Sequence, residues 1–201
     1  MAALNTYEMT TLLWHIAQRP KVITSLGVFS ADRLPTVARL ENTLANTPNC
    51  CFVANTDPAK RPGKHWVLFV ATKSKNGRIQ LEYFDSYGLP MPMYADLYST
   101  CIRNQLLPYV SVVSIISLQD INSSVCGHYC LLFAHFRATG RSFKFIVNFL
   151  RSRAVTAKER DKGVVCALHS VLHRHRYFTH ANSNCLASSK GFQQSCCSAT
   201  I

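Results

Sequence analysis

The sequence is poor in acidic residues and has no segment suited to crossing a membrane. Only 10 Asp and Glu stand against 22 Lys and Arg, giving a formal net charge of +12. No apolar run reaches the length that spans a bilayer. Residues 1–18 lack the basic start and uninterrupted apolar core of a secretory signal. We therefore expect no membrane partner. The charge by itself favours an anionic partner, nucleic acid first and a membrane surface second, with a role in solubility alone as the alternative.

The cysteines lack the regular spacing of a disulfide framework. There are nine, an odd number, so we expect a reducing compartment and mostly free thiols. Cys126 and Cys130 lie one helical turn apart, but no second pair completes a four-ligand metal site. A further group of possible metal ligands shares one face of an expected helix, and we interpret it as ordinary helix packing: Cys166, His169 and His173. No metal is predicted.

The apolar pattern predicts one α+β domain over residues 1–182, followed by a Ser- and Cys-rich, poorly ordered tail over 183–201. The expected order of a helix, several strands, a helix, a strand and then helices indicates a small, mostly antiparallel sheet packed by helices. Residues 22–35 are expected to be a loop with strand pieces, and 157–163 a charged break. Strands are expected at 47–56, 65–71, 78–84 and 109–117, and helices at 6–18, 94–107, 127–139, 143–150 and 164–174.

A hairpin is the strongest local signal in the chain. Asn76-Gly77 is a preferred turn sequence between two strands. His65 begins the first of these strands, and Asp85 follows the second. Closing the hairpin therefore brings a candidate base and a carboxylate that could orient it to the same end of the sheet.

A polar turn that runs into an apolar segment supplies the candidate nucleophile. Cys126 opens that segment, which we expect to be a buried helix, and the positive end of a helix dipole favours a thiolate. Gln119, together with the backbone N–H of Cys126, can form an oxyanion hole. Gly127 permits close approach of another backbone. With the hairpin pair, this constellation is typical of a cysteine hydrolase.

The chain resembles the adenovirus-type cysteine protease (adenain) family. The resemblance covers roughly residues 5–180 and is most specific around the cysteine. It implies a papain-like cysteine protease fold and acyl transfer, with Cys126 as nucleophile, His65 as base, Asp85 as its orienting acid and Gln119 in the oxyanion hole. It is carried by His65-Trp66, the seven-residue interval from Gln119 to Cys126, Asn122-Ser123, Cys126-Gly127 and Cys130.

Two departures from the adenoviral pattern refine this resemblance. Asp85 stands where adenoviral enzymes usually have Glu, which is similar to SUMO- and ubiquitin-like-protein proteases and to proteases of Polinton/Maverick elements and adintoviruses. Val125 and the long Gln-to-Cys interval favour the viral branch. Cys101 is the nearest candidate for the cysteine that links to an activating peptide, but it is off register. Peptide activation therefore stays open, and DNA activation fits the charge.

The resemblance implies a monomeric endopeptidase that matures viral capsid or core precursors in the host nucleus and virion. It would cleave near glycine, with no cofactor for the chemistry and with DNA as an activator. Two alternatives stay open: a protease that removes SUMO or another ubiquitin-like protein, and a non-catalytic DNA-binding relic. Trp66 and Gly127 are expected at the substrate cleft, although Trp66 could equally pack in the core. Nucleic-acid contacts, or merely solvated surface, are expected at Lys60, Arg61, Lys64, Arg174 and Arg176.

Overall fold

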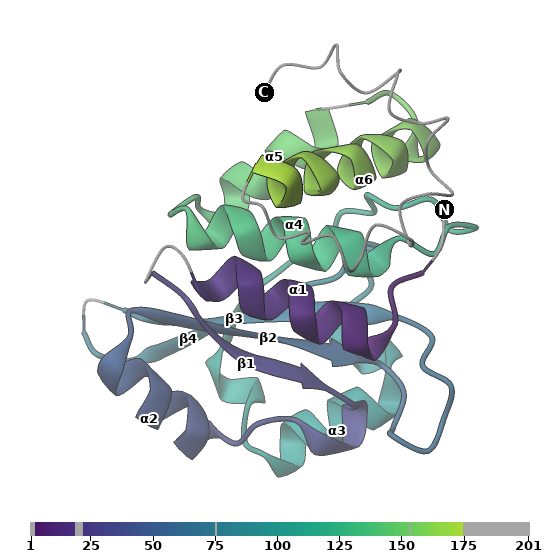
Figure 1. The fold of residues 1–201 in the computed structure, drawn as a ribbon. Coiled ribbons are helices and arrows are strands. Elements are labelled where there is room, and N and C mark those ends of the chain that lie inside the picture. The colour runs from purple at the N-terminus through teal and green to yellow at the C-terminus, as the bar shows by residue number, and fades with distance from the viewer. Residues whose placement is uncertain (1–2, 19–21, 75, 153, 175–201) are drawn as a thin grey trace.

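The computed structural model describes residues 3–18, 22–74, 76–152 and 154–174 (Figure 1). The expected tail at 183–201 and Arg176 lie outside these residues. The helices are α1 (Thr6–Gln18), α2 (Val37–Asn46), α3 (Ala95–Arg103), α4 (Cys126–Ala138), α5 (Phe143–Ser152) and α6 (Ala157–Arg174). The strands are β1 (Thr24–Phe29), β2 (Asn49–Asn55), β3 (Trp66–Lys73), β4 (Ile79–Phe84) and β5 (Val110–Val113).

One mixed sheet organises the molecule. Its five strands lie in the order β1-β2-β3-β4-β5. The central ladders, β2 with β3 and β3 with β4, are antiparallel, as expected. The two edge strands, β1 on β2 and β5 on β4, pair in parallel. The α+β class and the small helix-packed sheet are confirmed, and the antiparallel character is confined to the centre of the sheet.

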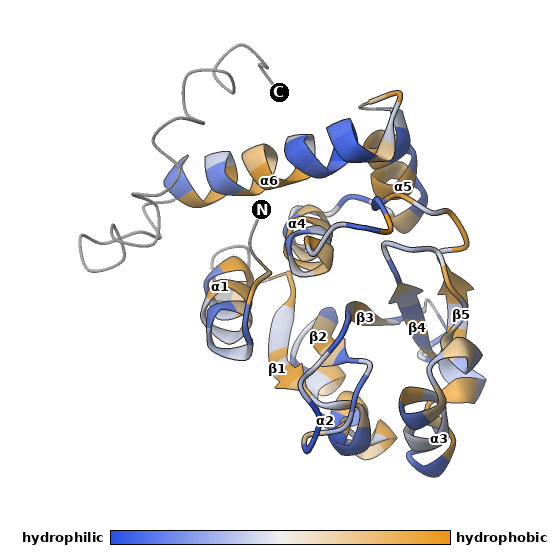
Figure 2. Ribbon diagram, turned by 90° about the vertical axis from the view of Figure 1, so that its right-hand side faces the viewer, coloured by the Kyte–Doolittle hydropathy of each residue, from blue (hydrophilic) through white to orange (hydrophobic). Residues whose placement is uncertain are grey.

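Helices cover both faces of the sheet, so the central strands are buried on both sides (Figures 1 and 2). Helices α1, α4, α5 and α6 lie over one face, and α2 and α3 lie over the other. Strand β3 is therefore a nearly continuous apolar run rather than an alternating one. Alternate side chains of β3 pack in separate cores on the two faces of the sheet. Trp66, Leu68 and Val70 lie in one core, and Val67, Phe69 and Ala71 lie in the other.

Helix α4 lies between the sheet with α1 on one side and α5 with α6 on the other (Figure 1). It is buried over most of its length, which explains why its sequence is apolar on nearly every face. The expected buried helix at 127–139 is confirmed and begins one residue earlier, at Cys126. The N-terminus of this helix is thus held firmly against the sheet.

Three expectations need correction. The strand expected at 109–117 is only β5, Val110–Val113, and the residues after it turn toward the site. The charged segment 157–163 is the first part of α6, because Thr156 and Glu159 form a capping box with reciprocal bonds from their backbone N–H groups. Helix α2 lies where no element was expected, and the Thr36 hydroxyl caps it. No helix among the described residues is long and apolar enough to span a bilayer.

Candidate active site

The β3–β4 hairpin brings His65 and Asp85 together, as its sequence predicts. Gly77 adopts a φ of +74° and its N–H donates to Ser74 O at 2.9 Å, while Ser74 N donates to Arg78 O. This is the three-residue hairpin geometry that needs glycine at its left-handed position. At the far end of the two strands, His65 Nε2 lies 2.8 Å from Asp85 Oδ1.

Asp85 is fully buried and its two oxygens accept several hydrogen bonds. The backbone N–H of Tyr87 donates to Oδ1 at 2.7 Å, in addition to His65. The hydroxyls of Tyr94 and Tyr83 donate to Oδ2 at 2.8 and 3.4 Å. These donors replace the water that a buried carboxylate loses, so Asp85 can face the imidazole as an anion.

The imidazole of His65 is held in its charged form. Burial alone would lower its pKa, but the hydrogen bond to Asp85, assisted by Cys126, raises the pKa to about 9. Because Asp85 occupies Nε2, the ring nitrogen that serves Cys126 is Nδ1. This atom is buried and has no conventional hydrogen-bond partner among the described residues. Nδ1 is therefore available to exchange a proton with the thiol.

Cys126 is the first residue of α4, where the N–H groups of a helix point outward. Its side chain is buried apart from a 6% exposed fraction. The other free thiols that the structure describes lie deeper, and burial raises the pKa of each of them: Cys50, Cys51, Cys101 and Cys130. Cys166 is disulfide-bonded. Cys126 is thus the described free thiol that combines an imidazolium neighbour with a helix N-terminus.

Gln119 is fixed by the turn that follows β4. Its Oε1 accepts from the Ser86 hydroxyl at 2.7 Å, and its backbone N–H donates to Ser86 O at 2.9 Å. Its Nε2 donates to Ser123 O at 2.9 Å and to the Tyr87 hydroxyl at 3.2 Å. Both amide N–H groups are therefore bonded within and beside the loop that leads to Cys126, and an oxyanion could accept from Gln119 only if one of these bonds were exchanged.

Gly88 allows this turn to approach the Gln119 loop. It has a φ of +70°, and a Cβ there would lie 2.6 Å from Ile116 C and Ser117 N. Both the left-handed conformation and the close backbone contact exclude a side chain. One turn, residues 85–88, thus carries the candidate orienting acid, Asp85, and also holds Gln119, the candidate oxyanion donor.

The first turn of α6 supports the Gln119 loop from behind. Arg160 donates through Nη1 to Leu118 O at 2.6 Å. Asp161 accepts from the Tyr129 hydroxyl at 2.9 Å and from the backbone N–H of Asp120 at 3.2 Å. Both side chains are buried. Sequence reasoning missed them because this segment was assigned to a charged break; the Thr156–Glu159 capping signal could have revealed it.

Trp66 and Gly127 pack against the N-terminal segment. The Trp66 indole N–H donates to Leu4 O at 3.0 Å, and its side chain belongs to the core. A Cβ on Gly127 would lie 2.8 Å from Met9 Sδ, so this glycine lets α1 approach α4. These contacts of Trp66 agree with the alternative expectation that its side chain packs in the core. A role in substrate binding stays a prediction for both residues.

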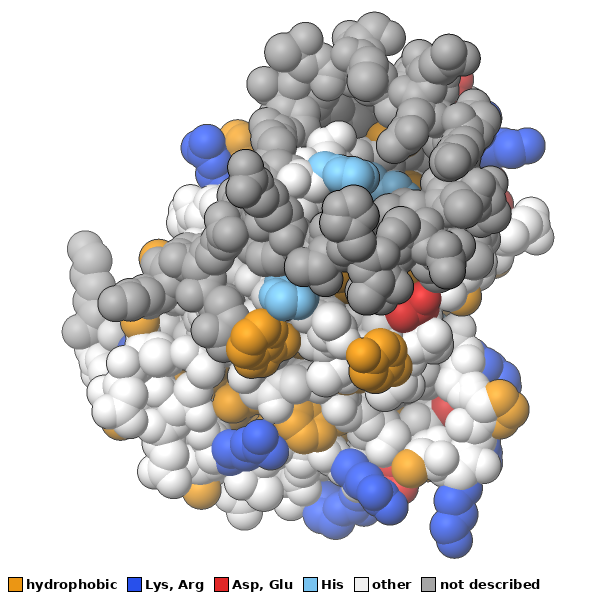
Figure 3. Space-filling view, in the orientation of Figure 1, with side chains coloured by type: hydrophobic (Ala, Val, Ile, Leu, Met, Phe, Trp, Pro, Cys, Tyr) orange, Lys and Arg blue, Asp and Glu red, His pale blue; other side chains and the backbone are white. Residues whose placement is uncertain are grey.

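Three of the basic residues expected to bind nucleic acid lie on the surface beside the site. Lys60, Arg61 and Lys64 are exposed in the loop that leads to His65, and Arg61 pairs with Asp96 at 3.2 Å. Lys and Arg side chains project along the lower edge of the face shown in Figure 3. Arg174 is the last residue of α6.

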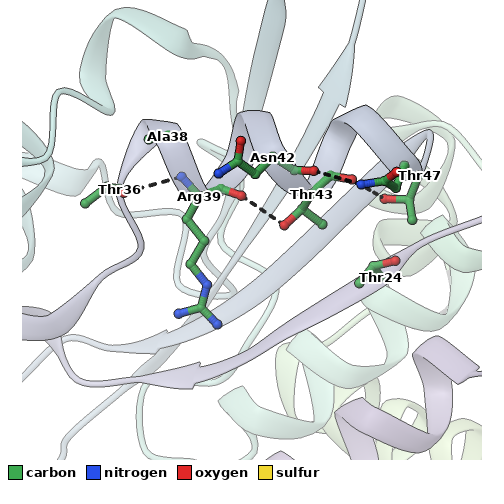
Figure 4. A pocket seen from close by; sticks show the side chains of 8 residues that line it. Thr24, Thr36, Ala38, Arg39, Asn42, Thr43 and Thr47 are labelled. Carbon is green, nitrogen blue, oxygen red and sulfur yellow. Dashed lines mark hydrogen bonds between the residues drawn. The ribbon is translucent and has the colours of Figure 1, made fainter.

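The rest of the described structure offers neither a metal site nor a second reactive pocket among the hollows lined by α2. Among the described residues, no group of three His, Cys, Asp or Glu side chains is placed to hold a metal ion. A polar hollow lies between α2 and the start of β1, on the sheet face opposite α4 (Figure 4). Its side chains carry no general base or thiol: Thr24, Thr36, Ala38, Arg39, Asn42, Thr43, Asn46 and Thr47. This hollow therefore lacks the thiol, imidazole and carboxylate that lie together at the His65–Cys126 site.

The fold is shared with a known viral protease. No protein-family profile and no curated protein sequence matches the chain. Among solved structures, the selenomethionine crystal structure of the ASFV pS273R protease is similar, with a TM-score of 0.55 over 81% of this chain at 19% identity. The chain spans 66% of the length of that protein. This likeness shows the fold, a papain-like cysteine protease fold of the SUMO-protease type, and leaves the adenain resemblance to the sequence motifs.

Proposed function

We propose that this chain is a cysteine endopeptidase. The observation that carries the proposal is the 2.8 Å bond between His65 and Asp85, which leaves Nδ1 of the imidazole for Cys126 at the start of α4. A thiol, a charged imidazole, a buried orienting acid and an aimed amide are the parts that acyl transfer needs. They are assembled here on a fold that a viral protease shares.

The geometry supports a two-step hydrolysis. The Cys126 thiolate attacks the scissile carbonyl carbon. The oxyanion accepts hydrogen bonds from the backbone N–H of Cys126 and from one Gln119 N–H, which exchanges its longer, 3.2 Å bond to the Tyr87 hydroxyl for this one. The Nδ1 proton of His65 passes to the amine as the C–N bond breaks, leaving a thioester on Cys126. Nδ1 then takes a proton from water, whose hydroxide attacks the thioester and releases the acid and the thiolate. Asp85 holds Nε2 throughout.

The sequence resemblance extends the proposal to substrates and place. We infer an adintovirus- or Polinton/Maverick-like member of the adenain group that cleaves viral capsid or core precursors near glycine. Its action would take place in the host nucleus and virion, as a monomer. DNA is proposed as the activator, supported by the +12 charge and by exposed Lys60 and Lys64 next to the site. No activating peptide is assigned.

Removal of a ubiquitin-like protein is the second candidate. The observation that favours it is the acid itself, because Asp85 is similar to the acid that deconjugating proteases have at this position. Both candidates use the same catalytic groups, so they differ in the substrate that reaches Cys126. The third candidate, a DNA-binding relic, is disfavoured by the intact arrangement of His65, Asp85 and Gln119.

A cleavage assay separates these candidates. A glycine-containing peptide library is incubated with wild type, Cys126→Ala and the control Cys101→Ala, which removes a buried thiol in the other core. We expect cleavage by wild type and Cys101→Ala but not by Cys126→Ala. Labelling of Cys126 by a SUMO or ubiquitin vinyl sulfone, with the library left intact, would instead support deconjugation. Cleavage that persists in Cys126→Ala would exclude this nucleophile.

Adding DNA tests the activator. Stimulation of cleavage and DNA binding should both weaken steeply with salt if phosphate contacts dominate. The double variant Lys60→Ala/Lys64→Ala is expected to reduce the slope of log affinity against log salt by about two, one for each lost contact. A flat salt response in wild type would contradict DNA activation while leaving the protease proposal standing.

A further inference from the structure

Tyr87 contacts several parts of the candidate site from one position. It lies between Ser86 and Gly88 in the turn after β4 and is half-buried. Its ring stacks on the imidazole of His65, with centroids 4.5 Å apart and planes at 25°. Its backbone N–H donates to Asp85 at 2.7 Å. The Tyr87 side chain takes no part in the bond making and proton transfers of the proposed hydrolysis.

The hydroxyl of Tyr87 joins the oxyanion amide to the loop before the nucleophile. It accepts from Gln119 Nε2 at 3.2 Å and donates to Ser123 O at 3.0 Å. Gln119 Nε2 also donates to Ser123 O at 2.9 Å, so the three groups close a triangle. Ser123 precedes Cys126 by three residues. The hydroxyl therefore fixes the position of Gln119 relative to the backbone that enters α4.

The ring and the hydroxyl act on different partners. The ring covers one face of the imidazole and restricts its rotation about the bond to the main chain. The hydroxyl restricts rotation of the Gln119 amide, whose other end is already held by the Ser86 hydroxyl at 2.7 Å. Donor groups that are held in place before the substrate arrives need less reorganisation when charge develops on the substrate oxygen. The free energy of activation is therefore lower.

We propose that Tyr87 is a positioning residue for both the base and the oxyanion donor, with the hydroxyl acting through Gln119 and the ring acting through His65. This inference rests on the proposed cysteine protease function and adds a residue to it. Tyr94 differs in its partners: it lies farther from the imidazole, at 5.8 Å, and its hydroxyl donates to Asp85. Tyr87 is the described tyrosine that hydrogen-bonds to Gln119.

Two substitutions separate the two roles. Tyr87→Phe keeps the ring and removes the hydroxyl, so we expect kcat to fall about tenfold with KM within about twofold. This loss is smaller than the factor of about 10² to 10³ for deleting an oxyanion donor. Alkylation of Cys126 by iodoacetamide needs no oxyanion hole, so its rate and pH profile should stay at the wild-type values. Tyr87→Leu removes the ring as well and should shift the pH profile of alkylation.

A double-mutant cycle shows whether the hydroxyl works through Gln119. In a Gln119→Ala background, Tyr87→Phe is expected to lower kcat no further, because the group that it positions is absent. Tyr98→Phe is the matched control, since Tyr98 lies on α3 and packs against the core on the other face of the sheet, and it should leave every reading unchanged. Thermal melting checks that each variant folds.

The outcomes are distinguishable from a failure of the proposed function. Wild-type kcat in Tyr87→Phe, an additive effect on Gln119→Ala, or parallel loss of alkylation would overturn the positioning role. If the wild type cleaves no peptide and no conjugate, the protease proposal fails instead. The alkylation profiles then still decide the ring's role: an unshifted profile in Tyr87→Leu overturns it, and a shift confined to that variant supports it.

Discussion

Replacing Asp85 with Asn should move the alkaline limit of activity by a measurable amount. In wild type, His65 has a pKa of about 9 instead of the ordinary 6.5, against the effect of burial and because of its bond to Asp85, assisted by Cys126. Acylation needs the Nδ1 proton, so kcat/KM should fall as pH rises through about 9. Without the carboxylate charge, burial dominates, and we expect the alkaline limb of Asp85→Asn to move below about pH 7.

The same shift has a consequence for folding. A raised pKa in the folded state stabilises the protein fully below 6.5, and this contribution is lost as pH rises through about 9. The difference between these values corresponds to on the order of 3 kcal/mol. Wild type should therefore lose about this much unfolding free energy between pH 6 and 10 from His65 alone, and Asp85→Asn should lose much less over the same range.

Both readings come from simple titrations. The pH dependence of kcat/KM for peptide cleavage is measured from pH 5 to 10, and urea unfolding is measured at pH 6 and pH 10. Asp96→Asn is the matched control, because it removes a partly exposed carboxylate that pairs with Arg61 and not with His65. An alkaline limb at the same pH in wild type and Asp85→Asn would refute the reasoning, whatever the effect on rate.

Two further predictions concern backbone and helix geometry. Gly88→Ala should destabilise the fold by at least about 2 kcal/mol more than Gly140→Ala, because both positions have positive φ but only at Gly88 would a Cβ contact backbone atoms. Of the two variants, only Gly88→Ala should reduce kcat. Equal unfolding free energies of the two variants would contradict the contact. Thr156→Ala should cost about 1 kcal/mol in urea unfolding by removing the cap of α6. Unchanged stability of that variant would show that the capping box contributes nothing.

Local signals predicted much of the arrangement. The Asn76-Gly77 turn was enough to expect the contact between His65 and Asp85, because a hairpin joins the ends of its strands by geometry alone. The apolar run after Cys126 predicted a buried helix that begins at the thiol, since all its faces are covered.

Long-range contacts were beyond the sequence pattern. Ser86 and Tyr87 reach Gln119 from 32 or 33 residues away, and Asp161 reaches Asp120 from 41 residues away, so no local spacing reveals them. The parallel edge strands likewise depend on how distant segments pack. The start of α6 is different, because its Thr-x-x-Glu capping signal was present and the charged residues outweighed it in the interpretation.

Peptide cleavage by single-residue variants of the site tests the central claim most directly. Wild type, Cys126→Ala and His65→Ala are incubated with the same glycine-containing library, with and without DNA, and new peptide N-termini are counted by mass spectrometry. We expect cleavage by wild type at sites near glycine and none by either variant, each still folded by thermal melting. Cleavage that survives in either variant, or a wild type that cleaves no peptide under both conditions, would contradict an endopeptidase built on Cys126 and His65.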